Sequence, residues 1–195
     1  MDNIENEQFV ILSVIGPHAG ETEDEIFRRK IRDISNIGKT FWLIKSYNAK
    51  PDLVQQFCRY ARAESRNVFT VFIEPSTKGG AIPTKESSGA REYSEDKTKW
   101  TGFPIGLTPV TGKIDGNTFA LIFDRLELLP TRTNIDLWNY AGFFNQENPI
   151  TIRQGGSTLC AIKKDMSRCK NKIKSRFRRV VAVGKLCNPY CVWLR

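Results

Sequence analysis

The sequence lacks the segments that mark membrane and secreted proteins. Its longest apolar run, residues 9–16, is far too short to cross a bilayer. Residues 1–8 are acidic rather than basic, so we expect no secretory signal. These two absences predict a cytoplasmic protein without a membrane partner.

The sequence also has little that could bind a transition metal. Its one histidine is His18, and its five cysteines contain no CxxC pair. An odd number of cysteines without a secretory signal indicates reduced thiols. The cysteine spacing is irregular, so we predict neither a zinc site nor a disulfide.

Acidic residues are almost absent from the last 45 positions. Residues 1–150 carry 18 Lys and Arg against 20 Asp and Glu, whereas residues 151–195 carry 12 against one. Such an asymmetry is typical of a surface that binds a polyanion. The charge therefore favours a nucleic-acid-binding protein.

Nine of these basic residues lie within residues 163–179, which we call the basic segment. Each can neutralise one phosphate and release its counterions. The spacing of Ile173 and Phe177 predicts a short helix that anchors this segment. The pattern does not distinguish DNA from RNA, and a protein–protein adaptor with an acidic partner is a further alternative. The residues predicted to contact nucleic acid are Arg153, Lys163, Lys164, Arg168, Lys170, Lys172, Lys174, Arg176, Arg178 and Arg179.

The first 75 residues alternate between strand and helix patterns. Apolar, β-branched runs at 9–15, 41–44 and 68–73 predict strands. Thr22 with Glu25 three residues later predicts one helix start, and Pro51 predicts another. This order predicts a β-α-β-α-β unit with a parallel sheet in an α/β or α+β fold.

The rest of the chain is organised differently. Residues 76–104 read as a long polar loop. Within it, residues 76–98 either form a lid over a ligand or are an idle insertion. Residues 105–195 read as a β-rich basic region, which could form one continuous domain with residues 1–75.

Polar side chains follow the three predicted strands of the first unit. In an open parallel sheet, ligands bind at the carboxyl ends of the strands. A catalytic site there would make the protein an enzyme, such as a hydrolase or nuclease, that acts on a nucleotide or nucleic acid. A divalent metal is possible in that case, and no other cofactor is predicted. The candidate catalytic residues are His18, Glu21, Lys45 and Glu74.

The six residues Phe41-Trp-Leu-Ile-Lys-Ser46 resemble the opening strand of the EVE family of PUA-like domains. The resemblance implies an association with nucleic-acid recognition. Here the strand follows a predicted strand and helix rather than opening the fold, so no site residue is carried over.

Overall fold

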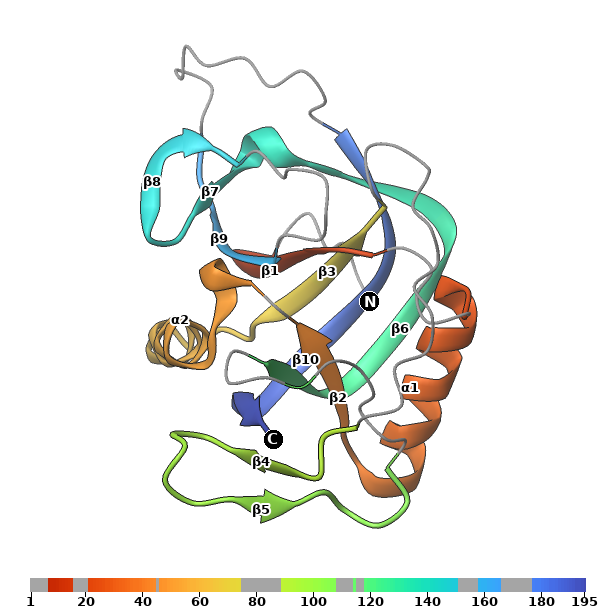
Figure 1. Cartoon of the computed structure of the whole chain (residues 1–195). Coiled ribbons are helices and arrows are strands. Elements are labelled where there is room, and N and C mark those ends of the chain that lie inside the picture. The colour runs from red at the N-terminus through yellow and green to blue at the C-terminus, as the bar shows by residue number, and fades with distance from the viewer. Residues whose placement is uncertain are drawn as a thin grey trace.

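The computed structural model describes residues 7–15, 21–44, 46–74, 89–107, 114, 118–150, 158–165 and 177–195. These residues form a mixed α/β fold with a large sheet (Figure 1). No helix among them is long and apolar enough to cross a membrane. The helices are α1 (Glu23–Ile37), η2 (Tyr47–Ala49), α2 (Pro51–Ala63) and η3 (Leu137–Asn139), where η marks a 3-10 helix. The strands are β1 (Phe9–Val14), β2 (Thr40–Ile44), β3 (Phe69–Ile73), β4 (Glu92–Ser94), β5 (Thr101–Gly102), β6 (Phe119–Asp136), β7 (Tyr140–Gly142), β8 (Asn145–Pro149), β9 (Thr158–Lys163) and β10 (Phe177–Leu194).

Both α-helices begin at the predicted local signals. The Thr22 hydroxyl accepts the backbone N–H of Glu25, whose carboxylate accepts the N–H of Thr22 at 2.8 Å. Gly38 ends α1 in the left-handed conformation, with a φ of 77°. Pro51 opens α2, where the missing proline N–H costs no helical hydrogen bond. The helix starts predicted from these residues are confirmed.

The strand pairing differs from the predicted parallel sheet. The strand order is β2-β6-β10-β3-β1-β9-β7-β8, and the β4–β5 hairpin attaches to β10. Among the described strands only β1 and β3 pair in parallel. β2 lies at the far edge and pairs antiparallel with β6. The prediction of parallel strands therefore holds for β1 and β3 but is wrong for β2, because the long strands β6 and β10 insert between β2 and β3.

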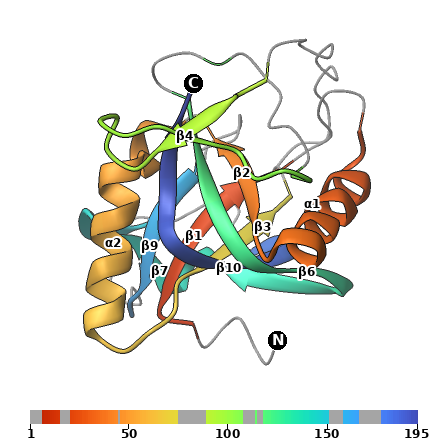
Figure 2. The ribbon, with the colours of Figure 1, turned by 90° about the horizontal axis from the view of Figure 1, so that it is seen from below.

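The sheet curls around an apolar interior. η3 joins the end of β6 directly to β7, so the row from β6 through β10, β3, β1 and β9 to β7 returns toward its start (Figure 1). The face of the sheet that points away from this interior packs against both α1 and α2. The two helices lie on opposite sides of the molecule in Figure 2. The buried residues of the interior are Val10, Leu12, Phe69, Val71, Ile73, Ile135, Leu137, Tyr140, Ile150, Ala161, Val180 and Val183.

The second part of the predicted polar loop is a packed hairpin. β4 and β5 pair antiparallel, and β4 also pairs with the end of β10. Phe41 of β2 contacts the rings of Tyr93 and Phe103, with centroids 5.1 and 4.9 Å away. Trp100 lies under the Arg195 guanidinium at 4.2 Å. The aromatic residues hold this hairpin onto the sheet, so the loop prediction is wrong for residues 92–102. Residues 75–88 lie outside the described residues.

The start of β10 contradicts a second prediction, the anchoring of a short helix by Phe177. Phe177 begins this strand with 60% of its surface exposed, so it does not anchor a helix as its spacing from Ile173 predicts. Ile173 itself lies outside the described part of the chain. Strand pairing with Asp136 overrides the local helical spacing here.

Gly184 of β10 is expected to tolerate no larger side chain. A Cβ atom there would lie 2.8 Å from Cδ1 of Phe123 and 3.1 Å from Cδ1 of Leu126. Phe123 is fully buried and cannot move away. We expect Gly184→Ala to lower the free energy of unfolding by about 1–3 kcal/mol through overpacking. Urea denaturation measures this change.

Gly102→Ala is the matched control, because nothing lies within 4 Å of a Cβ at that strand position. Its free energy of unfolding should stay within about 0.5 kcal/mol of the wild type. Equal effects of the two substitutions would contradict the packing argument.

Candidate nucleic-acid interface

The described ends of the basic segment meet at η3. The backbone N–H of Lys164 donates to the carbonyl of Asn139, the last residue of η3, at 2.9 Å. Phe177 lies opposite Asp136, the residue before η3, in the β6–β10 ladder. The two ends of one 3-10 turn therefore hold both described ends of the basic segment.

Local hydrogen bonding and burial fix η3. The Asp136 carboxylate accepts the backbone N–H of Trp138 at 3.0 Å, which caps the turn. Leu137 and Tyr140 are buried in the interior, and the Tyr140 hydroxyl donates to the carbonyl of Glu7 at 3.4 Å. Trp138 stays partly exposed between them. These contacts hold η3 in place, and with it the residues that bind to its two ends.

Most of the basic segment lies outside the described residues. Twelve residues separate Lys164 from Phe177. They include five predicted nucleic-acid contacts, whose placement lies outside the described residues: Arg168, Lys170, Lys172, Lys174 and Arg176. Arg153 also lies outside them.

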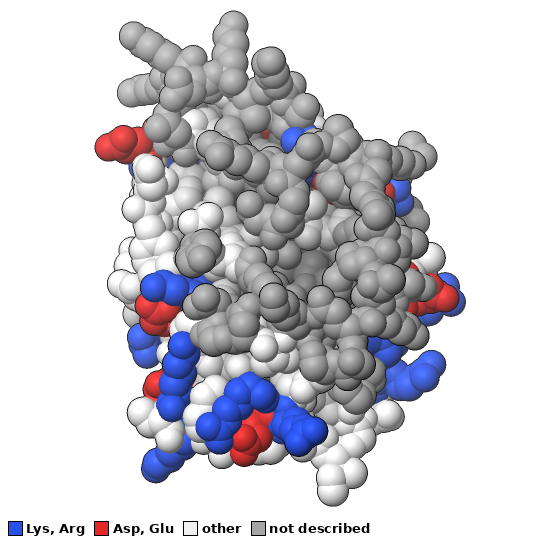
Figure 3. Space-filling model, viewed as in Figure 1, with Lys and Arg blue, Asp and Glu red and all other residues white. Residues whose placement is uncertain are grey.

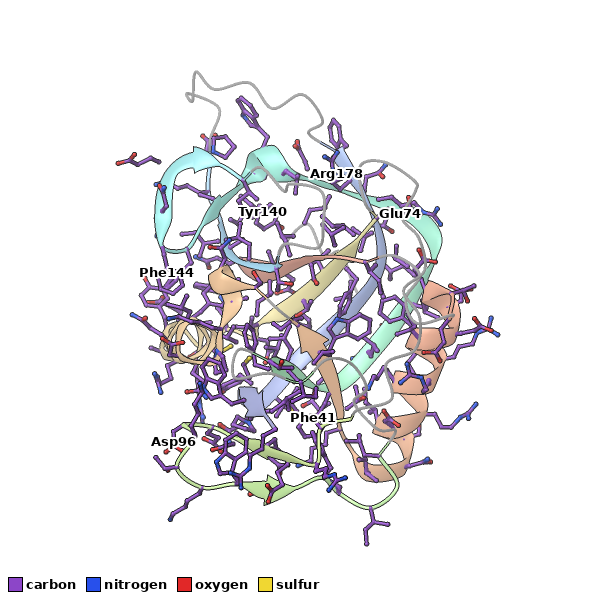
Figure 4. All side chains as sticks on the ribbon, viewed as in Figure 1. Phe41, Glu74, Asp96, Tyr140, Phe144 and Arg178 are labelled. Carbon is purple, nitrogen blue, oxygen red and sulfur yellow. The ribbon has the colours of Figure 1, made fainter. Side chains whose placement is uncertain are left out.

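The other four predicted contacts are described, and all four flank η3. Lys163 is exposed and lies opposite Tyr140 in the β7–β9 ladder. Lys164 is exposed, and its Nζ donates to the carbonyl of Gln146 at 3.1 Å. Arg178 lies opposite the buried Ile135, so its half-buried side chain is on the interior face of β10 (Figure 4). The backbones of Lys163 and Lys164 therefore lie beside the end of η3, and that of Arg178 lies near its start.

Arg179 is paired with Glu74, one of the predicted catalytic residues. Arg179 Nη1 donates to Glu74 Oε1 at 2.7 Å, and the Glu74 backbone N–H donates to the Arg179 carbonyl at 3.0 Å. Both side chains are partly exposed. The Glu74 carboxylate offsets part of the positive charge of Arg179.

Glu21, the second described residue of the predicted catalytic set, also binds an arginine. Its two carboxylate oxygens accept Arg29 Nε at 3.0 Å and Arg29 Nη2 at 2.6 Å. Glu21 and Glu74 are thus held by arginines on different elements. His18 and Lys45 lie outside the described residues, so the catalytic role of the set stays a prediction.

The ends of β1 and β2 do approach each other, although these strands are not neighbours in the sheet. The Ser13 and Thr158 hydroxyls are 3.2 Å apart, and the Ser46 hydroxyl donates to the Thr158 carbonyl at 2.8 Å. The start of β9 therefore connects the two strand ends that the sequence predicted to share a site.

Three cysteines cluster in the core but form no metal site. Cys58, Cys160 and Cys191 are buried in the cluster beneath α2 and carry free thiols, as does the half-buried Cys187. Burial raises the pKa of all three buried thiols well above the usual range, and the neighbouring thiols raise those of Cys58 and Cys191 further. Within the described ranges, no group of three or more His, Cys, Asp or Glu residues is placed to bind a metal ion. Cys169 lies outside those ranges.

The described charges on the face seen in Figure 3 are mixed in sign. Blue and red atoms lie side by side along the lower and lateral rim. These described rim residues therefore form no continuous basic field. The excess positive charge belongs to the basic segment and its surroundings.

The sequence reasoning missed a group of surface aromatic residues. Tyr60 of α2 and Phe144 of the β7–β8 turn are 51% and 47% exposed, and Phe143 lies between them. The adjacent pair Phe143-Phe144 was an available signal, since two neighbouring large aromatic residues seldom both enter one core. These rings lie outside both predicted sites.

Comparisons with known proteins give no relative from which a function could be transferred. No family model matches the chain, and neither a curated protein nor a solved structure matches it significantly. The short resemblance at residues 41–46 therefore gains no support, and the functional argument depends on the chain's own chemistry.

Proposed function

We propose that the protein binds nucleic acid through the basic segment and the residues around η3. The observation that carries the proposal is the anchoring of both described ends of the segment at one turn, beside Lys163, Lys164 and Arg178. The segment contains nine basic residues in its sequence, opposed there by Asp165 alone. Such a concentration of charge suits a phosphate backbone, because each neutralised phosphate releases condensed counterions.

A cytoplasmic location is part of the proposal. The four described cysteines are free, which is typical of a reducing compartment. A cytoplasmic protein with this charge meets nucleic acid as its most abundant polyanion.

Removal of charge from the basic segment is expected to weaken binding and flatten its salt dependence. The test variant replaces Lys170, Lys172, Lys174, Arg176 and Arg178 with Ala. We expect at least tenfold weaker binding at low salt. The slope of log affinity against log salt should fall by roughly 3–5, because each lost contact removes about 0.7–0.9 from it. Fluorescence anisotropy with a labelled oligonucleotide over a salt series measures both quantities.

A control variant with the same net charge separates local contacts from overall charge. We expect its affinity and salt slope to stay close to the wild type, and equal losses in both variants would contradict the proposed location. Stronger competition by polyglutamate than by oligonucleotide would favour the adaptor alternative. The control replaces five exposed basic residues that lie elsewhere: Arg28, Arg32, Arg91, Lys99 and Arg125.

A further inference from the structure

The exposed rings of Tyr60 and Phe144 form one continuous surface with Phe143, which we call the aromatic shelf. The ring centroids of Tyr60 and Phe143 are 5.3 Å apart, and those of Phe143 and Phe144 are 4.8 Å apart. About half of the surface of both outer rings is exposed. Figure 4 shows Phe144 on the outer side of the molecule, between β8 and α2.

The core holds the aromatic shelf in place from below. Phe57 contacts Phe143 edge-to-face at 4.9 Å, and Phe9 contacts both Phe57 and Tyr60 at 5.9 Å. Phe9 and Phe57 are almost fully buried. Buried rings therefore support Tyr60 and Phe143 from below, which lowers the side-chain entropy lost when a flat ligand stacks on them.

The aromatic shelf is also connected to the start of the basic segment. Gln146 Nε2 donates to the Phe143 carbonyl at 3.2 Å, and the Gln146 carbonyl accepts Lys164 Nζ at 3.1 Å. The ammonium group of Lys164 thus lies beside a residue only two positions from Phe144. A ligand on the aromatic shelf meets positive charge at its edge.

We propose that the aromatic shelf stacks the bases of a single-stranded nucleic acid whose phosphates contact Lys164 at the edge of the shelf. This inference rests on the proposed function and specifies its ligand. Exposed aromatic rings beside a basic surface are how sequence-tolerant single-strand binders hold bases, because every base has a π-face. In a duplex the bases stack on one another, so their faces are not available to the aromatic shelf.

The double variant Tyr60→Ala/Phe144→Ala tests this ligand. With a short oligoadenylate, as RNA and as DNA, we expect roughly ten- to a hundredfold weaker binding than for the wild type. The salt slope should not change, because no phosphate contact is lost. Affinity for a duplex of the same length should stay within about twofold of the wild type.

Two controls accompany the double variant. Tyr60→Phe keeps the ring and should retain most of the affinity. Ile105→Ala removes a fully exposed apolar side chain elsewhere and should have no effect. Circular dichroism and thermal melting establish that each variant is folded.

Other outcomes overturn the inference in distinguishable ways. Unchanged single-strand affinity of the double variant, or an equal loss for the duplex, would exclude base stacking at the aromatic shelf. Conversion of a wild-type dimer into a monomer would make the aromatic shelf an interface between two copies of the chain. If the wild type bound neither form of nucleic acid, the proposed function and the inference would both fail.

Discussion

Raising the pH from 8 to 10 is expected to cost the protein about 3–4 kcal/mol of its free energy of unfolding. The cause is the thiol cluster of Cys58, Cys160 and Cys191. Burial raises the pKa of each thiol, and the neighbouring thiols raise those of Cys58 and Cys191 further. An unfolded cysteine has a pKa of about 8.5. Above that pH the unfolded chain loses these protons while the folded chain keeps them.

The direction of this change in the free energy of unfolding follows from proton binding. Where the folded state holds more protons, stability falls as the pH rises, by about 1.4 kcal/mol per pH unit for each thiol. Three thiols therefore lose about 6 kcal/mol between their unfolded pKa and pH 10. Lys30 opposes this loss, because burial lowers its folded pKa to about 8. Over the same range Lys30 therefore adds about 2–3 kcal/mol to the free energy of unfolding, which leaves the net loss of about 3–4 kcal/mol.

Urea denaturation in reductant at a series of pH values measures the effect. The triple variant Cys58→Ala/Cys160→Ala/Cys191→Ala should be less stable than the wild type at pH 7, because it leaves small cavities. Its stability should nevertheless not fall between pH 8 and 10. A wild-type decline that persists unchanged in the triple variant would exclude the thiols as its cause.

The sequence predicted local features of this fold better than its long-range pairing. The helix starts at Thr22 and Pro51 depend on hydrogen bonds within a few residues, and those residues alone specify them. The position of β2 depends on β6, which begins about eighty residues later in the chain. No local pattern distinguishes a neighbouring parallel partner from such a distant antiparallel one.

The candidate interface could likewise be predicted from the sequence only in part. Composition alone located the basic segment, since charge excess needs no fold to be visible. The role of η3 was not predictable, because Asn139 and Asp136 meet Lys164 and Phe177 only after the sheet has formed. The aromatic shelf was missed for a similar reason. Its rings come from α2 and the β7–β8 turn, which are distant in sequence.

Asp33→Ala is expected to cost about 3–5 kcal/mol of the free energy of unfolding at pH 7, because it breaks a buried ion pair. Asp33 Oδ2 lies 3.7 Å from Lys30 Nζ and accepts the Thr40 hydroxyl at 2.9 Å. Lys30 and Asp33 are only 6% and 2% exposed. The substitution leaves a buried ammonium group and a buried hydroxyl without this partner.

The pH dependence identifies the ammonium group as the source of the cost. Burial is the main cause that lowers the Lys30 pKa, and the positive charge of Arg29 lowers it further, whereas Asp33 and Glu21 raise it. Without Asp33 the folded pKa should fall below its wild-type value of about 8. Above pH 8 the amine is largely neutral in both folded proteins. The difference in stability between Asp33→Ala and the wild type should therefore shrink between pH 7 and pH 9.

A double-mutant cycle completes the test. The double variant Lys30→Met/Asp33→Ala replaces the pair with apolar groups, so it should be markedly more stable at pH 7 than Asp33→Ala alone. Chemical denaturation of the wild type, both single variants and the double variant gives the coupling energy. Additive losses, together with a cost of Asp33→Ala that is the same at pH 7 and pH 9, would show that the two charges do not stabilise each other. In that case the 2.9 Å hydrogen bond from Thr40 would be the main contribution of Asp33 to the contact between α1 and β2.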